Sequence, residues 1–158
     1  TCDRSYGTIH RLSRGEIQLR NILFDSDVII DVLTKREPFF IESARALDFA
    51  AHDSGINLYI AAHAVTNIFY IVRRSLGVTE TRQSIEHLLQ KIEVAGVNDA
   101  IIRDALATNL KDFEDAVNIK TAEEINAELI ITRNLPDYEG ADVPAISPAT
   151  FLGMNTKS

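Results

Sequence analysis

Apolar residues along this chain form short continuous runs that alternate with longer segments of helical periodicity. The runs NILFD at 21–25 and INLYIA at 56–61 predict two buried strands. The segments EVAG at 93–96, ELIIT at 128–132 and PAIS at 144–147 predict three more. Strands that alternate with helices are typical of a parallel sheet covered on both faces. We therefore predict a single α/β domain whose parallel sheet of four to five strands is flanked by helices.

The segments between these strands repeat apolar residues at the three- and four-residue spacing of helices. Helices are predicted at 28–36, 37–55, 63–77, 79–92, 98–108, 112–127 and 148–154. In the second of these, Phe40, Ala44, Leu47 and Ala51 form the predicted apolar stripe, and Gly55 is the predicted stop.

Polar residues stand at the ends of three predicted strands. Asp25 ends the first strand, His63 follows the second, and Thr-Arg-Asn at 132–134 ends the strand ELIIT and begins the next loop. Ligands of open parallel sheets bind beyond the carboxyl ends of the strands, so we expect these residues to converge at one edge. His63 stays open to two interpretations, either a ligand or base or a hydrogen-bonded structural histidine.

Charge narrows the functional classes. The chain of 158 residues has a net charge of −7, whereas nucleic-acid-binding modules usually carry a basic surplus. This argues against a pure nucleic-acid-binding module but not against a nuclease in which divalent cations meet the phosphate. The lone Cys2 cannot form an internal disulfide, so a reducing compartment such as the cytoplasm is expected. No apolar run reaches the length of a membrane span.

The first twenty residues show no periodicity and carry four basic residues against two acidic ones. We interpret 1–20 as a vector-derived or disordered N-terminal extension, and 21–158 as the domain. The domain then holds 12 Lys and Arg residues against 21 Asp and Glu residues.

Acidic side chains gather in three separate segments of the domain. These are Asp25 and Asp27 after the first strand, Asp112, Glu114 and Asp115 at the start of helix 112–127, and Asp137 after the strand 128–132. Oxygen ligands from separate segments are what Mg²⁺ and Mn²⁺ take, and two such ions can activate water against a phosphodiester.

Each acidic group also has a simpler interpretation. Asp25 with Asp27, and Asp112 with Asp115, fit the pattern of helix caps and of acids that favour a helix N-terminus. Asp137 fits a turn residue.

The order of these motifs resembles a known family. LFDSDVIIDVLTKREPF, then AAHAVTNIFYIVRR, then DFEDAVNIKTAEEINAELIITRNLPDY together resemble the PIN domain, more narrowly its VapC-like toxin ribonucleases. The resemblance covers about residues 21–153. It implies an acidic pocket that binds Mg²⁺ or Mn²⁺ and cleaves single-stranded RNA, a homodimer, and inhibition by a small antitoxin protein.

The resemblance also implies roles for individual residues. Asp25 and Asp115 match the acidic residues that hold the ion directly. Asp112 is a supporting carboxylate that is also expected among the metal ligands. Thr132 matches the hydroxyl that orients the first aspartate.

Two positions depart from the family pattern. Asn67 stands where many members carry Glu, and Asn134 stands at the last acidic position, for which Asp137 is expected to supply the charge and a metal ligand. Fewer charges should weaken metal binding, particularly of a second ion.

Asp27 and Asp31 are assigned supporting positions, although Asp31 also fits a solvated helix charge.

These observations predict metal-assisted hydrolysis of RNA by Asp25, Asp115, Asp137, Asn134 and Asn67. Four basic residues are expected to guide the substrate backbone, namely Lys35, Arg36, Arg73 and Arg74.

Two hypotheses from other functional classes are alternatives to the nuclease. A catalytically weak PIN-like module would bind RNA or a protein partner, which the amides at 67 and 134 favour. A receiver-like phosphorylation domain expects an Asp ending a middle strand and a Lys ending a late strand, and the sequence offers neither.

Overall fold

The computed structural model describes residues 19–155 and contains a parallel sheet within them. Its strands are β1 (Arg20–Phe24), β2 (Ile56–Ala61), β3 (Glu93–Ala95), β4 (Leu129–Ile131) and β5 (Ala145–Ile146). The strands lie in the order β3-β2-β1-β4-β5, and every neighbouring pair is parallel. The predicted fold class, a parallel α/β sheet of four to five strands flanked by helices, is confirmed, and the sheet has five strands.

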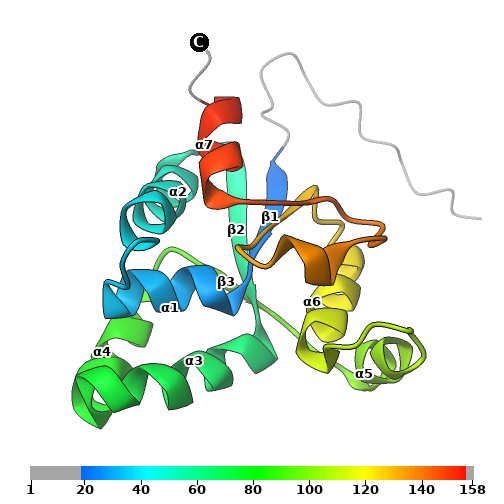
Figure 1. Ribbon diagram of the computed structural model, residues 1–158, viewed down its shortest axis with the longest axis horizontal. Coiled ribbons are helices and arrows are strands. Elements are labelled where there is room, and N and C mark those ends of the chain that lie inside the picture. Colours follow the sequence, from blue (N-terminus) through cyan, green and yellow to red (C-terminus); the bar gives the residue numbers. More distant parts are fainter. Residues whose placement is uncertain (1–18, 156–158) are drawn as a thin grey trace, which may run out of the picture.

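Helices cover the sheet from two sides, as Figure 1 shows. They are α1 (Ser26–Thr34), α2 (Phe40–His52), α3 (Ala62–Leu76), α4 (Val78–Leu88), α5 (Asp99–Leu106), α6 (Phe113–Glu124) and α7 (Pro148–Asn155), with the 3-10 helix η1 (Leu135–Tyr138) between β4 and β5. Helices α1 to α4 lie to the left of β1 in that view, and α5 and α6 lie to its right. No helix within residues 19–155 combines the length and apolar character needed to cross a bilayer.

The strand order reverses direction beside β1. The chain steps outward from β1 to β2 and β3, and then returns to the other side of β1 for β4 and β5. The carboxyl ends of β1 and β4 are therefore neighbours at a topological switch point, which is where open α/β sheets bind ligands.

The main core lies between the sheet and the helices packed on it, which are α1, α2, α3, α6 and α7. Phe24, Ile60 and Ile130 are fully buried on the central strands. The ring of Phe151 in α7 meets Phe24 edge to face at a centroid distance of 6.4 Å and Phe49 at 5.8 Å. Such burial contributes about 1.5–3 kcal/mol for each large apolar side chain.

Strand β2 has its predicted bounds, and the other elements differ from the predictions by up to four residues at an end. Helix α1 starts at Ser26, not 28, and ends at Thr34 because Lys35 adopts a left-handed conformation with φ of 51°. The buried stripe of α2 is Ser43, Ala46 and Ala50, one position before the predicted stripe, whose residues are half-buried. This helix contacts β2, α1 and α7, so its covered surface is wider than one stripe.

The domain interpretation of residues 1–20 concerns mostly residues 1–18, which lie outside the described part of the chain. Strand β1 begins at Arg20, one residue before the expected boundary. The backbone N–H of Arg20 donates to the Gly55 carbonyl at 2.8 Å, and its guanidinium pairs with Glu128.

Candidate active site

Asp25 lies at the end of β1 and is almost completely buried, with 4% of its surface exposed. It occupies the N-cap position of α1, yet its side chain accepts no capping hydrogen bond. Its Oδ2 instead accepts hydrogen bonds from Thr132 Oγ1 at 2.8 Å and Tyr138 Oη at 2.9 Å. Its Oδ1 accepts one from Asn118 Nδ2 at 3.2 Å. Side chains from three other segments thus orient this carboxylate, and helix capping does not explain it.

The Tyr138 hydroxyl lies between two carboxylates. Its oxygen is 2.9 Å from Asp25 Oδ2 and 3.1 Å from Asp115 Oδ1, while Asn118 Nδ2 donates to it at 3.1 Å. A phenol has one hydrogen to donate, so both oxygen contacts are hydrogen bonds only when one carboxyl group carries a proton. Burial, followed by the charges of Asp25 and Asp115, raises the pKa of Tyr138, so the phenol keeps its hydrogen.

Asp115 is a carboxyl group whose surroundings favour the protonated form. Burial, followed by the nearby charges of Asp25 and Asp112, raises the pKa of Asp115 to about 8. Its Oδ2 is buried and has no hydrogen-bond partner among residues 19–155. A buried acceptor without a donor is costly, and a cation would satisfy it.

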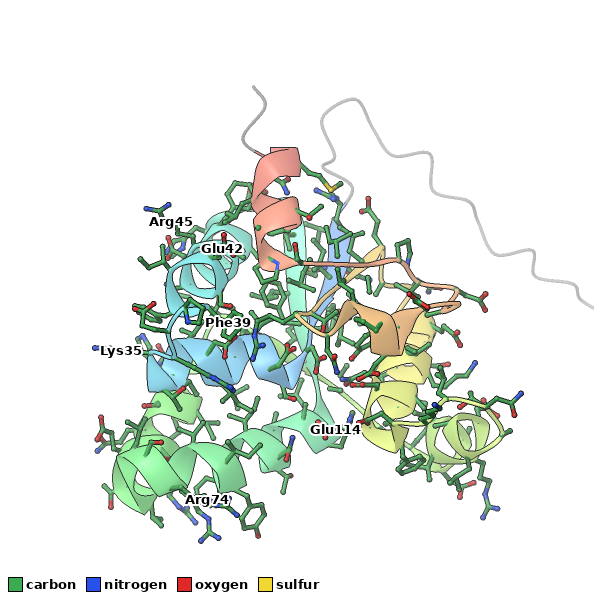
Figure 2. All side chains as sticks on the ribbon, in the orientation of Figure 1. Lys35, Phe39, Glu42, Arg45, Arg74 and Glu114 are labelled. Atoms are coloured by element: carbon green, nitrogen blue, oxygen red, sulfur yellow. The ribbon has the colours of Figure 1, made fainter. Side chains whose placement is uncertain are left out.

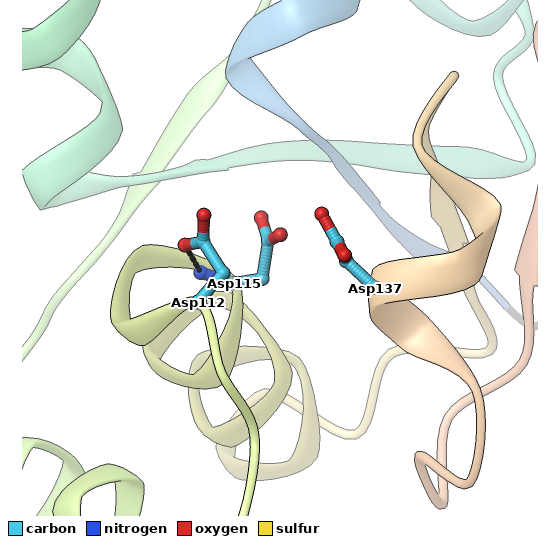
Figure 3. A group of neighbouring side chains, drawn as sticks. All are labelled: Asp112, Asp115 and Asp137. Atoms are coloured by element: carbon cyan, nitrogen blue, oxygen red, sulfur yellow. Dashed lines mark hydrogen bonds between the residues drawn. The ribbon is translucent and has the colours of Figure 1, made fainter.

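Three carboxylates meet beside the start of α6. Oxygens of Asp112, Asp115 and Asp137 lie within 4.8 Å of one another, and Figure 3 shows the three side chains facing a common space. Asp112 is also the N-cap of α6, because its Oδ1 accepts from the Asp115 N–H at 3.1 Å. The capping interpretation of Asp112 is therefore right, and it coexists with membership of the cluster. Asp25 is outside this trio and reaches it through Tyr138.

The two amides that depart from the family pattern each contact a carboxylate. Asn134 Nδ2 donates to Asp137 Oδ2 in η1. Asn67 Nδ2, on α3, donates to Glu114 Oε1 at 2.9 Å. Asn67 is therefore connected to the acidic residues of α6, although it lies 47 positions before Glu114 in the chain.

Asp27 and Asp31 are held by the residue that follows Thr132. The backbone N–H of Arg133 donates to Asp27 Oδ2 at 3.1 Å, and burial, with the charge of Asp25, raises the pKa of Asp27 to about 7. Asp31 is fully buried and accepts from Arg133 Nε at 2.5 Å and Nη2 at 3.1 Å. Asp31 is thus not a solvated charge, and it fastens the loop after β4 to α1.

The four basic residues expected to guide substrate do not lie at the carboxylates. Lys35 and Arg36 follow the far end of α1, and Arg73 and Arg74 stand in the last turn of α3. Figure 2 shows Lys35 and Arg74 well separated from Glu114. The structure does not bring these side chains to the acidic cluster, because both helices run away from it.

His63 lies at the start of α3, near the acidic residues as the strand-end rule predicts. Both of its ring nitrogens are buried and have no hydrogen-bond partner among the described residues. Burial lowers the pKa of His63, and the charges of Glu114 and Asp25 partly oppose this shift. The interpretation of His63 as a hydrogen-bonded structural histidine is therefore not supported within residues 19–155.

Three site residues were not assigned from the sequence. Asn118 and Tyr138 contact Asp25, and Glu114 contacts Asn67. Asn118 follows Asp115 by three positions, close to one helical turn, and interrupts an apolar run, which is the signal that could have identified it. Tyr138 adjoins Asp137, but no sequence pattern indicates that its hydroxyl turns inward.

Four carboxylates, those of Asp25, Asp112, Asp115 and Asp137, have no ion-pair partner among the residues that the structure describes. The ion pairs found there join other carboxylates, and the only one near the site joins Arg133 to Asp31. Oxygen donors without protein cations fit a hard divalent ion, and the partnerless Asp115 Oδ2 points to the same conclusion.

The sequence was compared with models of protein families, and the model described as PIN domain matches residues 21–136. The chain belongs to the PIN domain family. The match includes Asp25, Asn67, Asp115 and the Thr-Arg-Asn turn of this PIN domain. Comparison with curated proteins finds no significant match.

Solved structures share the fold of this PIN domain at low identity. A toxin–antitoxin complex from Klebsiella pneumoniae superimposes with a TM-score of 0.60 at 22% identity, covering 80% of this chain and 97% of that one. VapBC-1 from nontypeable Haemophilus influenzae gives 0.64 at 17% identity, covering 82% and 98%. FitAcB from Neisseria gonorrhoeae gives 0.58 at 19%, covering 81% and 98%. The fold is that of PIN proteins from toxin–antitoxin systems.

Proposed function

We propose that this PIN domain is a metal-dependent endoribonuclease that hydrolyses single-stranded RNA as the toxin component of a toxin–antitoxin pair. Membership of the PIN family supports a nuclease. The structural neighbour from Klebsiella pneumoniae, which is described as a toxin–antitoxin complex, supports the more specific role.

One observation carries the proposal. Asp112, Asp115 and Asp137 converge within 4.8 Å at the switch point of the sheet, next to the buried Asp25. No lysine or arginine of residues 19–155 pairs with any of the four. Asp112 is exposed and Asp137 is half-buried, but Asp115 and Asp25 are buried, where like charges repel most strongly. Protons or cations between these carboxylates would therefore stabilise the arrangement at neutral pH.

Individual residues have separate tasks in the proposed reaction. Asp115, Asp137, Asp112 and Asp25 would hold Mg²⁺ or Mn²⁺, which supplies a lowered pKa for bound water and polarises the phosphoryl oxygen. Thr132 and Asn118 orient the Asp25 carboxylate by their hydrogen bonds.

The amides act through neighbouring carboxylates. Asn134 orients Asp137, and Asn67 orients Glu114. In neither case does an amide act as a base, since an amide has no proton-accepting group of suitable pKa.

The test is cleavage of single-stranded RNA, with tRNAs and mRNAs as the panel, in the presence of Mn²⁺, Mg²⁺ or a chelator. Wild type should cleave only with metal, and Asp25→Asn and Asp115→Asn should each abolish cleavage. Asp104→Asn, an exposed acid on α5, is the matched control and should retain full activity. Full activity of both site variants would refute the site, and metal-independent cleavage would refute the mechanism.

A second candidate is a catalytically weak module that binds RNA or a protein partner. It is favoured by the amides at positions 67 and 134 and by the engagement of both Asp25 oxygens with protein donors. Calorimetry distinguishes the two functions, because the module predicts no heat of binding at millimolar Mn²⁺ or Mg²⁺, whereas the nuclease predicts binding that Asp115→Asn removes.

We further propose a cognate antitoxin protein, a homodimer and a cytoplasmic site of action. An antitoxin arginine that reaches the carboxylates would form charge-assisted hydrogen bonds there. The substrate class and the single cysteine of the chain fit a reducing cytoplasm. Inhibition of RNA cleavage by the product of a small neighbouring reading frame tests the partner, and sedimentation equilibrium tests the dimer.

A further inference from the structure

Glu114 is fixed by side chains from two other helices. Its Oε1 accepts hydrogen bonds from Asn67 Nδ2 on α3 at 2.9 Å and from Ser26 Oγ on α1 at 3.2 Å. The same Ser26 hydroxyl is 3.4 Å from Asp25 Oδ1, so a single hydroxyl separates the two carboxylates. Glu114 is half-buried and directly precedes Asp115 in α6. A long side chain that would otherwise lie in solvent is therefore directed inward toward Asp25.

This arrangement places the negative charge of Glu114 beside a site that already holds several carboxylates. No lysine or arginine of residues 19–155 pairs with Glu114. His63 lies close enough for the charge of Glu114 to act on it, but burial keeps the pKa of His63 low. A carboxylate that only accepted the two hydrogen bonds would serve no better than a glutamine, which offers the same oxygen without the repulsion.

We propose that Glu114 is a cation-binding carboxylate of this site, held on the α1 and α3 side by Ser26 and Asn67. This inference rests on the proposed metal site and adds to it a residue beyond Asp25, Asp112, Asp115 and Asp137. Asn67 serves the site by presenting Glu114.

The pair of Asn67 and Glu114 allows the charge to be moved without being lost. Glu114→Gln keeps an oxygen for the Asn67 and Ser26 donors and removes only the charge. Adding Asn67→Glu to it returns a carboxylate to the same contact, because the two side-chain ends are 2.9 Å apart. Glu124→Gln is the matched control, since Glu124 is exposed at the opposite end of α6.

The experiment is a titration of the full chain with Mn²⁺ alone, followed by calorimetry and by counting of free ions by electron paramagnetic resonance. Glu114→Gln should weaken Mn²⁺ binding about tenfold, and the double variant should recover to within about threefold of wild type. The metal-free melting temperature of Glu114→Gln should stay level or rise, because like charges are relieved, whereas loss of a purely structural contact would lower it.

Asp115→Asn separates failure of this inference from failure of the proposed function. If Asp115→Asn loses Mn²⁺ binding while Glu114→Gln binds like Glu124→Gln, Glu114 is not part of the site and the inference is overturned. If the double variant stays as weak as Glu114→Gln, the charge is not what matters, and the inference is again overturned. If Asp115→Asn binds as wild type does, the metal site itself is wrong.

Discussion

Replacing Arg133 by methionine should destabilise this PIN domain strongly, although Arg133 is partly exposed at the surface. Its guanidinium holds Asp31, a carboxylate with no exposed surface, through contacts of 2.5 and 3.1 Å. Its side chain is 25% exposed and also stacks on the ring of Phe39 at 3.9 Å. Methionine fills a similar volume but leaves the buried carboxylate without a counter-charge.

The magnitude follows from the burial of Asp31. Removing one partner of a buried ion pair costs about 3–5 kcal/mol, because the remaining charge stays buried and uncompensated. Loss of the stacking on Phe39 adds about 0.5–1 kcal/mol. For a domain of this size each kcal/mol lowers the melting temperature by roughly 2–4 °C, so we expect a fall of about 7–24 °C.

Thermal unfolding followed by circular dichroism measures this change, and two variants control it. Arg103→Met breaks an ion pair to Asp99 whose side chains are 75% and 80% exposed, and it should cost less than about 1 kcal/mol. Asp31→Asn combined with Arg133→Met removes the stranded charge and should recover most of the loss. An Arg133→Met protein that melts like Arg103→Met would show that burial of Asp31 does not govern this contact, and would refute the reasoning.

Three further predictions concern the acidic site. Tyr138→Phe removes the hydroxyl that donates to Asp25 and should destabilise the metal-free protein by about 1.5–3 kcal/mol in urea denaturation. An unchanged urea midpoint would show that this hydrogen bond does not stabilise the fold. Asp112→Asn keeps an N-cap oxygen and should retain stability while weakening Mn²⁺ binding, whereas Asp112→Ala should lose both, by about 1 kcal/mol of stability; equal stability of the two variants would exclude the capping role. The metal-free protein should lose stability as pH rises from about 4 to 8, because the unfolded state ionises first while folded Asp115, with a pKa of about 8, keeps its proton. Melting temperatures between pH 5 and 9 should fall more gently for Asp115→Asn, and parallel profiles for the two proteins would contradict the assignment.

The sequence predicts the convergence of distant residues because a parallel sheet leaves few choices. Once the runs at 21–25 and 128–132 are strands of one parallel sheet, their ends lie at one edge, so Asp25 and Thr132 must be near one another. The observed contact between them measures 2.8 Å. Helix boundaries were less predictable, because features such as the left-handed Lys35 end a helix without any break in the apolar pattern.

The inner contacts of the site could not be predicted in the same way. Which residues surround Asp25 depends on how α6 and η1 turn against the sheet, and periodicity does not report that rotation. Asn118 and Tyr138 are both deeply buried, with 0% and 4% exposure, yet each is a residue type often found at surfaces. Conversely, the adjacent arginines at the end of α3 are conspicuous in sequence and lie away from the carboxylates.

The hydrogen bonds of Asn67 and Asn134 change the interpretation of the charges that are missing at these two positions. Judged by position, Asn67 and Asn134 each remove a carboxylate, which favours a weak or inactive site. In the fold, each amide donates to a carboxylate from another position, Glu114 and Asp137 respectively. Electrostatic potential at the metal depends on where charges lie in space and not on which residue supplies them. With Glu114 as the proposed ligand, the site keeps a carboxylate beside each of the two amides, and the amide hydrogen bonds orient these carboxylates. Moving the charge from Glu114 back to position 67 tests this equivalence directly.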